Sequence, residues 1–285
     1  MDLEAFEKEK KELNIDTYVE GAMHFLGIRE YSKALRFLEQ STKSFEMGQQ
    51  VENTEDTEYY SFNDNIEFFT KIIENSYNEK NSNVISLNPN YSKMYHILGY
   101  LYLEFKNYDE AEEALKKAII LDPVSAVTYL EYAEIYKKRN GWDKFLFLVK
   151  SGLKYAKNPE TLGRAFRGLG YYFCEMKIYD LASALYLHSL QFDDNRYLVR
   201  AEIDYINKLS GYIVDDITPE KAIQYILEKG IDIEISNYVF AAYMKFLQSL
   251  NGSQSSTKID GYSEYLKKMV LSSEKMNYLK SLKNT

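Results

Sequence analysis

Cysteine and proline are scarce in this sequence, and each shortage excludes a class of protein. The single cysteine, Cys174, excludes an intramolecular disulfide framework and any metal site built from several thiolates. Only four prolines and thirteen glycines in 285 residues are too few for the many turns of an all-β fold. Apolar residues make up 45% of the chain, which is ample for a hydrophobic core.

Long apolar runs and an excess of positive charge are also missing. The longest run, residues 235–244, is far shorter than the ~20 residues that span a bilayer. The densely charged first ten residues resemble neither a secretory signal nor a lipoprotein leader. Lys and Arg number 35 against 43 Asp and Glu, which disfavours nucleic acid as a ligand because phosphates need clustered positive charge. We therefore expect a cytoplasmic protein that binds neither membranes nor nucleic acid.

Three of the four prolines recur at nearly equal spacing, which indicates an internal repeat. Pro89 and Pro123 lie 34 residues apart, and Pro159 follows 36 residues later. The block between the first two prolines reads Tyr95-x2-Leu98-Gly99-x2-Tyr102 and then Tyr108-x2-Ala111-x3-Leu115-x2-Ala118. The apolar residues fall at steps of three and four, so each half of the block predicts a helix with one apolar face.

This block resembles the tetratricopeptide repeat, whose unit is a pair of antiparallel helices. Gly99 and Ala111 are small where the two helices approach closely, and Lys106-Asn107 forms the turn between them. Asp122 ends the second helix because the proline that follows it disfavours helical geometry. The resemblance implies an all-α fold, a right-handed α-α superhelix of stacked pairs with a concave surface and a C-terminal capping helix.

The resemblance also divides the chain into segments. We expect an N-terminal helix over residues 1–14, a repeat array over 15–250, a linker over 251–260 and a C-terminal helix over 261–285. Within the array, the expected units span residues 15–48, 58–91, 92–125, 126–162 and 163–196, with a degenerate part over 197–250. The unit at 58–91 is the least regular, because Asn65 replaces the small central residue. The acidic segment 46–67 carries seven carboxylates and no Lys or Arg, which fits a solvated loop.

In tetratricopeptide-repeat proteins, partners usually lie along the concave face that the first helix of each unit builds. Counted from the small residue at each helix centre, the resemblance places nine residues of this chain on that face. They are Lys93, His96, Tyr100, Glu134, Lys137, Lys138, Arg164, Arg167 and Tyr171. The resemblance thus implies a groove whose cations bind carboxylates of an extended peptide and whose tyrosines supply apolar contact area. Alternatively, these residues form an ordinary surface in which neighbouring glutamates balance the positive charges.

The sequence contains no motif that marks an enzyme. A Gly-rich phosphate loop, a His-Glu-x-x-His zinc helix and a Gly-x-Ser-x-Gly elbow are all missing. His24, His96 and His188 lie in three different units, which disfavours a shared metal site. We expect no catalytic residue, cofactor or metal, and an interaction scaffold with a protein or peptide partner. Two alternatives remain: a structural protein that forms a homo-oligomer through its C-terminal helix, and a peptide-sensing regulatory subunit.

Overall fold

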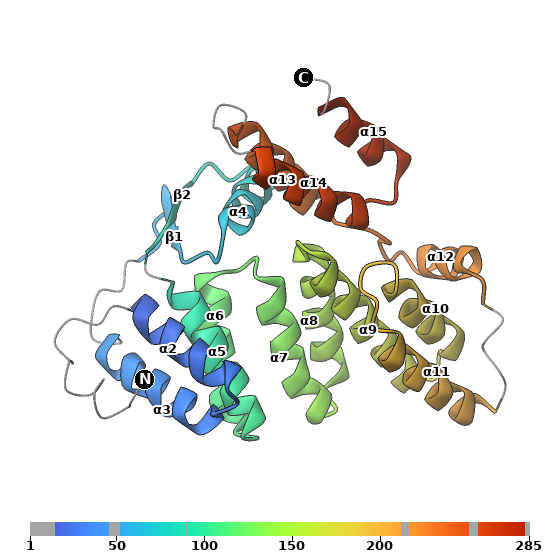
Figure 1. Ribbon diagram of the computed structural model, residues 1–285, viewed down its shortest axis with the longest axis horizontal. Helices are drawn as coiled ribbons and strands as arrows, with labels where there is room; N and C mark the ends of the chain where they lie inside the picture. The colour runs from blue at the N-terminus through green and yellow to red at the C-terminus, as the bar shows by residue number, and fades with distance from the viewer. Residues whose placement is uncertain (1–14, 46–51, 89, 212–216, 251–255, 283–285) are drawn as a thin grey trace. The chain divides into compact units, whose positions relative to one another are not determined.

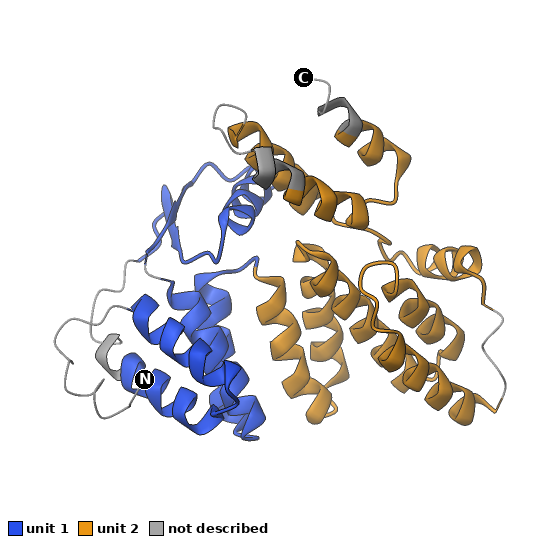
Figure 2. Cartoon of the chain, viewed as in Figure 1, with its two compact units in different colours: residues 1–124 blue, residues 125–285 orange. Residues whose placement is uncertain are grey.

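Helices dominate the computed structural model, which describes residues 15–45, 52–88, 90–211, 217–250 and 256–282. These residues form fourteen helices and two short strands (Figure 1). The predicted all-α fold of paired helices is confirmed, apart from one small sheet. The chain divides into two units, residues 1–124 and residues 125–285 (Figure 2). The helix predicted over residues 1–14 lies outside the described residues.

Two helical hairpins form most of the first unit. Their helices are α2 (Ile15–Gly27) with α3 (Tyr31–Phe45), and α5 (Tyr91–Glu104) with α6 (Tyr108–Leu121). Helix α5 packs on both α2 and α3, and one apolar core joins the two hairpins. A Cβ atom at Gly99 would lie 2.5 Å from Cγ of Leu115, so the close crossing of α5 and α6 requires glycine there.

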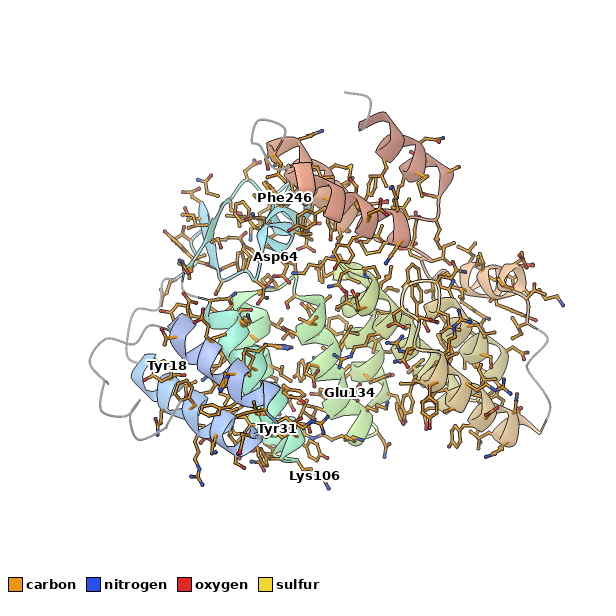
Figure 3. All side chains as sticks on the ribbon, viewed as in Figure 1. Tyr18, Tyr31, Asp64, Lys106, Glu134 and Phe246 are labelled. Carbon is orange, nitrogen blue, oxygen red and sulfur yellow. The ribbon has the colours of Figure 1, made fainter. Side chains whose placement is uncertain are left out.

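The same turn closes four helical hairpins in the described part of the chain. Its central residue adopts the left-handed conformation, with φ between 53° and 61°, and is Arg29, Lys106, Asn140 or Lys177. The next N–H bonds back to a carbonyl five residues earlier, as from Asn107 to Tyr102 at 2.8 Å. This Schellman motif satisfies the last carbonyls of the first helix and redirects the chain (Lys106 is labelled in Figure 3). An aromatic residue then begins the second helix.

The structure differs from the helix pair expected at 58–91. Only one helix, α4 (Asn65–Tyr77), forms there, between strands β1 (Thr57–Tyr60) and β2 (Asn83–Ser86). The strands pair in parallel, with Glu58 opposite Val84. Helix α4 still ends in the hairpin turn, with φ of 55° at Glu79. The residues after this turn are rich in Asn, Ser and β-branched side chains, which are poor helix formers, so a strand replaces the second helix.

A buried carboxylate holds β1, α4 and β2 together. Glu58 accepts hydrogen bonds from Asn75 at 2.6 Å, from Ser82 at 3.0 Å and from the ammonium group of Lys80. Burial alone would raise the pKa of Glu58, but these three hydrogen bonds outweigh burial and lower the pKa from 4.5 to about 2. The carboxylate is therefore charged, although only 4% of the residue is exposed.

The second unit continues with helical hairpins. Its first five helices are α7 (Ala126–Lys138), α8 (Trp142–Tyr155), α9 (Pro159–Glu175), α10 (Tyr179–Ser189) and α11 (Arg196–Ser210). Helices α7 and α8 form one hairpin, α9 and α10 form the next, and α11 packs against α10. Helix α12 (Pro219–Glu228) also packs on α10. Thus α7, α9 and α11 are the first helices of three successive repeats.

The C-terminal region differs from the expected linker over 251–260 and single helix over 261–285. Helices α13 (Asn237–Leu250), α14 (Ser256–Met269) and α15 (Ser273–Leu282) occupy it. Between α14 and α15, Glu234 accepts hydrogen bonds from the N–H groups of Leu271 and Ser272, at 2.5 and 2.7 Å. Helices α13 and α14 pack on α8 and α9. Two of the C-terminal helices, α13 and α14, therefore contact earlier helices of the same unit.

Candidate partner-binding groove

A hollow of about 270 Å³ lies in the second unit, where α7, α9 and α11 contribute to one surface. Five of the nine predicted groove residues line it: Glu134, Lys137, Arg164, Arg167 and Tyr171. Glu134, labelled in Figure 3, projects from α7. The first helices of successive repeats therefore form a shared surface, as the family resemblance implied for these residues.

The other four predicted residues lie outside this hollow. Lys138 is exposed at the end of α7 and does not line the hollow. Lys93, His96 and Tyr100 are half-buried on α5, in the first unit. The ring of Tyr100 packs against the core of that unit, so it has a structural role.

Both arginines of the hollow already bind carboxylates of the chain itself. Arg164 donates from Nη2 to Glu131 at 3.0 Å and to the carbonyl of Leu130 at 3.3 Å. Arg167 donates from Nη1 to both carboxylate oxygens of Asp193, at 2.6 and 2.8 Å. The sequence predicted that these arginines bind carboxylates of a ligand. In the structure, Glu131 and Asp193 of the chain itself already bind them. Glu131 lies one repeat before Arg164 in the sequence, and opposite charges at that spacing would have indicated the ion pair.

Tyr171, which lines the hollow, lies at the centre of an aromatic cluster. Its ring contacts Trp142 and Phe145, with centroid distances of 6.1 and 5.9 Å. The ammonium nitrogen of Lys137 lies 3.9 Å from the centroid of the same ring, which is a cation–π contact. Burial, together with the charge of Glu175 and a hydrogen bond to it, raises the pKa of Tyr171 to about 12. The phenol is therefore neutral at physiological pH and donates to Glu175.

Helix α11 contributes two lining residues that the sequence analysis missed, Leu198 and Glu202. Glu202 accepts a hydrogen bond from Tyr186, and burial together with this carboxylate raises the pKa of the Tyr186 phenol. Leu198 and Glu202 lie 34 positions after Arg164 and Gly168. One further step of the repeat period would therefore have predicted them, although the motif itself is lost in this part of the chain.

Cys174 and His188, the most reactive side-chain types among the buried residues of the second unit, are both enclosed by the fold. Cys174 is buried, and burial followed by the charges of Glu175 and Glu202 raises the pKa of its thiol to about 11, which disfavours the reactive thiolate. His188 is buried with its Nε2 at 2.8 Å from the carbonyl oxygen of Ile233. Within the part of the chain that the structure describes, no three His, Cys, Asp or Glu side chains gather as a metal site. Among the described helices, none has both the length and the hydrophobicity that a membrane crossing requires.

Comparison with known proteins identifies the repeat family of the α5–α6 hairpin. Residues 92–125 match the family model of the tetratricopeptide repeat. No curated protein matches the chain. The solved structure of Pseudomonas aeruginosa PilF is 14% identical, with a TM-score of 0.49, over 93% of this chain and 96% of that one. The C-terminal part of a TPR repeat-containing protein from Cytophaga hutchinsonii is 12% identical, with a TM-score of 0.37, over 91% and 98% of the two chains.

These observations define the general class of the protein. The chain is an all-α protein built from successive helical hairpins. More specifically, it contains a tetratricopeptide repeat at residues 92–125, and this confirms the resemblance on which the sequence analysis relied.

Proposed function

We propose that this protein is an interaction scaffold that holds a peptide segment of a partner protein in the hollow between α7, α9 and α11. The tetratricopeptide repeat at residues 92–125 supports a general role in protein interaction. The observation that carries the proposal is the shared hollow of three successive first helices, with Tyr171 as its aromatic centre. A cytoplasmic location stays a prediction from the sequence.

An exposed apolar stripe on α11 extends this surface. Leu198, Tyr205 and Leu209 are 37%, 49% and 47% exposed, and they lie on one face of the helix at steps of seven and four residues. Leu198 lines the hollow, and Tyr205 is near enough to Tyr171 to contribute to the raised pKa of that phenol. Covering such side chains gives about 25 cal/mol per Å² of apolar area, which is the usual source of affinity in peptide grooves.

A pull-down from source-cell lysate tests the proposal through a matched pair of variants. The double variant Leu198→Ala/Tyr205→Ala removes two exposed side chains of the groove without opening the core. Tyr197, which is 89% exposed on the same helix and does not line the hollow, gives the control Tyr197→Ala. We expect at least one protein to bind the wild type and the control but to be reduced about tenfold with the double variant. Identical capture by all three proteins would contradict the proposal.

The main alternative, self-association through the C-terminal helix, requires that helix to be available. In this structure α14 packs on α9 and α13 of its own chain. The loop before α13 is tied to α15 by Glu234, whose carboxylate lies 2.8 Å from the ammonium nitrogen of Lys275. These contacts engage the C-terminal helices within the chain, so we favour the groove as the interaction surface.

A further inference from the structure

The repeat period places equivalent residues of α7, α9 and α11 in rows across the hollow. Positions 34 residues apart form three such rows: Leu130, Arg164 and Leu198; Glu134, Gly168 and Glu202; and Lys137, Tyr171 and Tyr205. Direct contacts support this register, since Arg164 bonds to the carbonyl of Leu130 and Lys137 stacks on Tyr171. In the middle row, two glutamates flank a glycine that has no side chain, and all three residues line the hollow.

The two arginines of the hollow have their charges paired within the chain. Arg164 and Arg167 form ion pairs with Glu131 and Asp193. Lys137 lies over the ring of Tyr171. A carboxylate of a ligand would have to displace one of these contacts, and displacing Asp193 would leave a largely buried charge without its partner.

Three carboxylates in and beside the hollow, Glu134, Glu175 and Glu202, are in contrast not neutralised by an ion pair in the described part of the chain. The Glu134 carboxylate makes no hydrogen bond or ion pair with the described part of the chain. Glu175 and Glu202 accept hydrogen bonds from the phenols of Tyr171 and Tyr186. A neutral phenol satisfies a lone pair of a carboxylate but leaves its charge in place.

The lining side chains of the hollow alone carry three cations and two carboxylates, but the balance becomes negative when their direct partners are included. The lining residues and their direct partners comprise five carboxylates and three cations, an excess of two negative charges. A cationic side chain that enters the hollow could form a charge-assisted contact with Glu134 or with Glu202 without breaking an existing ion pair. The apolar stripe of Leu198, Tyr205 and Leu209 continues directly from this point along α11.

We propose that the groove binds a basic, amphipathic segment of a partner protein, with Lys or Arg side chains beside Glu134 and Glu202 and apolar side chains along α11. This inference rests on the proposed function and gives the partner its chemistry. The predicted charge of the ligand is therefore positive, whereas the sequence alone had suggested an acidic ligand. Electrostatic complementarity of this kind sets specificity and association rate, and salt screens it.

Selection from a phage-displayed library of random peptides of about twelve residues tests the inference on the full chain. Counter-selection against the Leu198→Ala/Tyr205→Ala variant removes peptides that bind elsewhere. Enriched peptides are then synthesised and their affinities measured for wild type and for Glu134→Gln/Glu202→Gln, at low and physiological salt. Glutamine retains an acceptor for the Tyr186 hydroxyl, so the fold is kept. Glu228→Gln, on α12 away from the hollow, is the matched control.

The expected result is a pool rich in Lys and Arg whose affinity falls about tenfold in Glu134→Gln/Glu202→Gln, is unchanged in Glu228→Gln, and decreases with salt. A groove-dependent pool that is acidic or uncharged would overturn the charge inference but leave the proposed function standing. If no peptide survives counter-selection, both the inference and the proposed function fail.

Discussion

Arg167 and Asp193 form an ion pair in which one guanidinium nitrogen donates to both carboxylate oxygens, at 2.6 and 2.8 Å. The pair joins α9 to the segment that follows α10, and its side chains are only 14% and 18% exposed. Removing one partner leaves the other charge largely buried, which usually costs several kcal/mol. Arg167 therefore stabilises the fold, although the sequence placed it in the groove as a ligand residue.

We predict that Arg167→Ala and Asp193→Ala each lower the free energy of unfolding by about 2 kcal/mol. The double variant should lose less than the sum of the two, with a coupling of about 1 kcal/mol or more, because the second change removes an already unpaired charge. Urea denaturation of the wild type, the two single variants and the double variant measures this double-mutant cycle. Strictly additive losses would show that the ion pair does not stabilise the chain.

Gly163 makes room for the same ion pair. A Cβ atom on Gly163 would lie 2.8 Å from Oδ2 of Asp193, so a methyl group there would push the carboxylate away. We predict that Gly163→Ala destabilises by about 1 kcal/mol, although alanine usually gains that amount over glycine within a helix. In the Asp193→Ala background the same substitution should become neutral or stabilising.

The matched control for this change is Gly27→Ala in α2. A Cβ on Gly27 would meet nothing within 4 Å, so alanine there should be neutral or stabilise by up to about 1 kcal/mol. Thermal or urea denaturation compares the two sites. A Gly163→Ala variant as stable as Gly27→Ala would contradict the packing around Asp193.

Because Glu58 is buried as a charged carboxylate, we expect the free energy of unfolding to depend on pH. The pKa of Glu58 is about 2 when folded, below the 4.5 of the exposed group, so its contribution is fully present above pH 4.5. The contribution is lost as the pH falls from 4.5 towards 2, and it amounts to at most about 3 kcal/mol. Glu58→Gln should be less stable than wild type at pH 7, and the difference should shrink at pH 3. A difference that stays constant between these two pH values would contradict the shifted pKa.

The left-handed turn residues offer a stabilising change. Lys106 and Lys177 have φ of 61°, a conformation that glycine adopts without a steric penalty. We predict that Lys106→Gly and Lys177→Gly each raise the free energy of unfolding by about 0.5 kcal/mol. Asn140→Gly should gain less, because asparagine already tolerates this conformation. Equal effects at all three sites, or a loss at the two lysines, would show that the turn is not strained there.

The local helical pattern of the sequence was sufficient to predict the hairpins. Large residues alternate with small ones at helical spacing, and the residues that require close approach, such as Gly99 opposite Leu115, are visible in the motif. The pattern failed at residues 58–91 because Pro89 preserves the repeat period while the composition after Glu79 favours a strand. Local propensity decided the outcome there.

The groove was predictable only in part. Spacing within each repeat identified the face that carries Lys137 and Tyr171, since equivalent positions of stacked helices lie side by side. The partners of the arginines were not predictable from that face. Glu131 is visible only when charges one repeat apart are compared, and Asp193 lies in a connecting segment whose position depends on how α10 ends. The sign of the groove's charge therefore required the three-dimensional arrangement.

Trp142 offers the most direct measurement of the central claim, that the hollow of the second unit binds a partner's segment. It is the only tryptophan of the chain, and its ring contacts Tyr171, which lines the hollow. Titration with a groove-selected basic peptide should change the Trp142 fluorescence in a saturable way, with a Kd that matches calorimetry. The change should be lost in Leu198→Ala/Tyr205→Ala and kept in Tyr197→Ala. Binding seen by calorimetry without a change in Trp142 emission, and with equal affinity for both variants, would contradict the account.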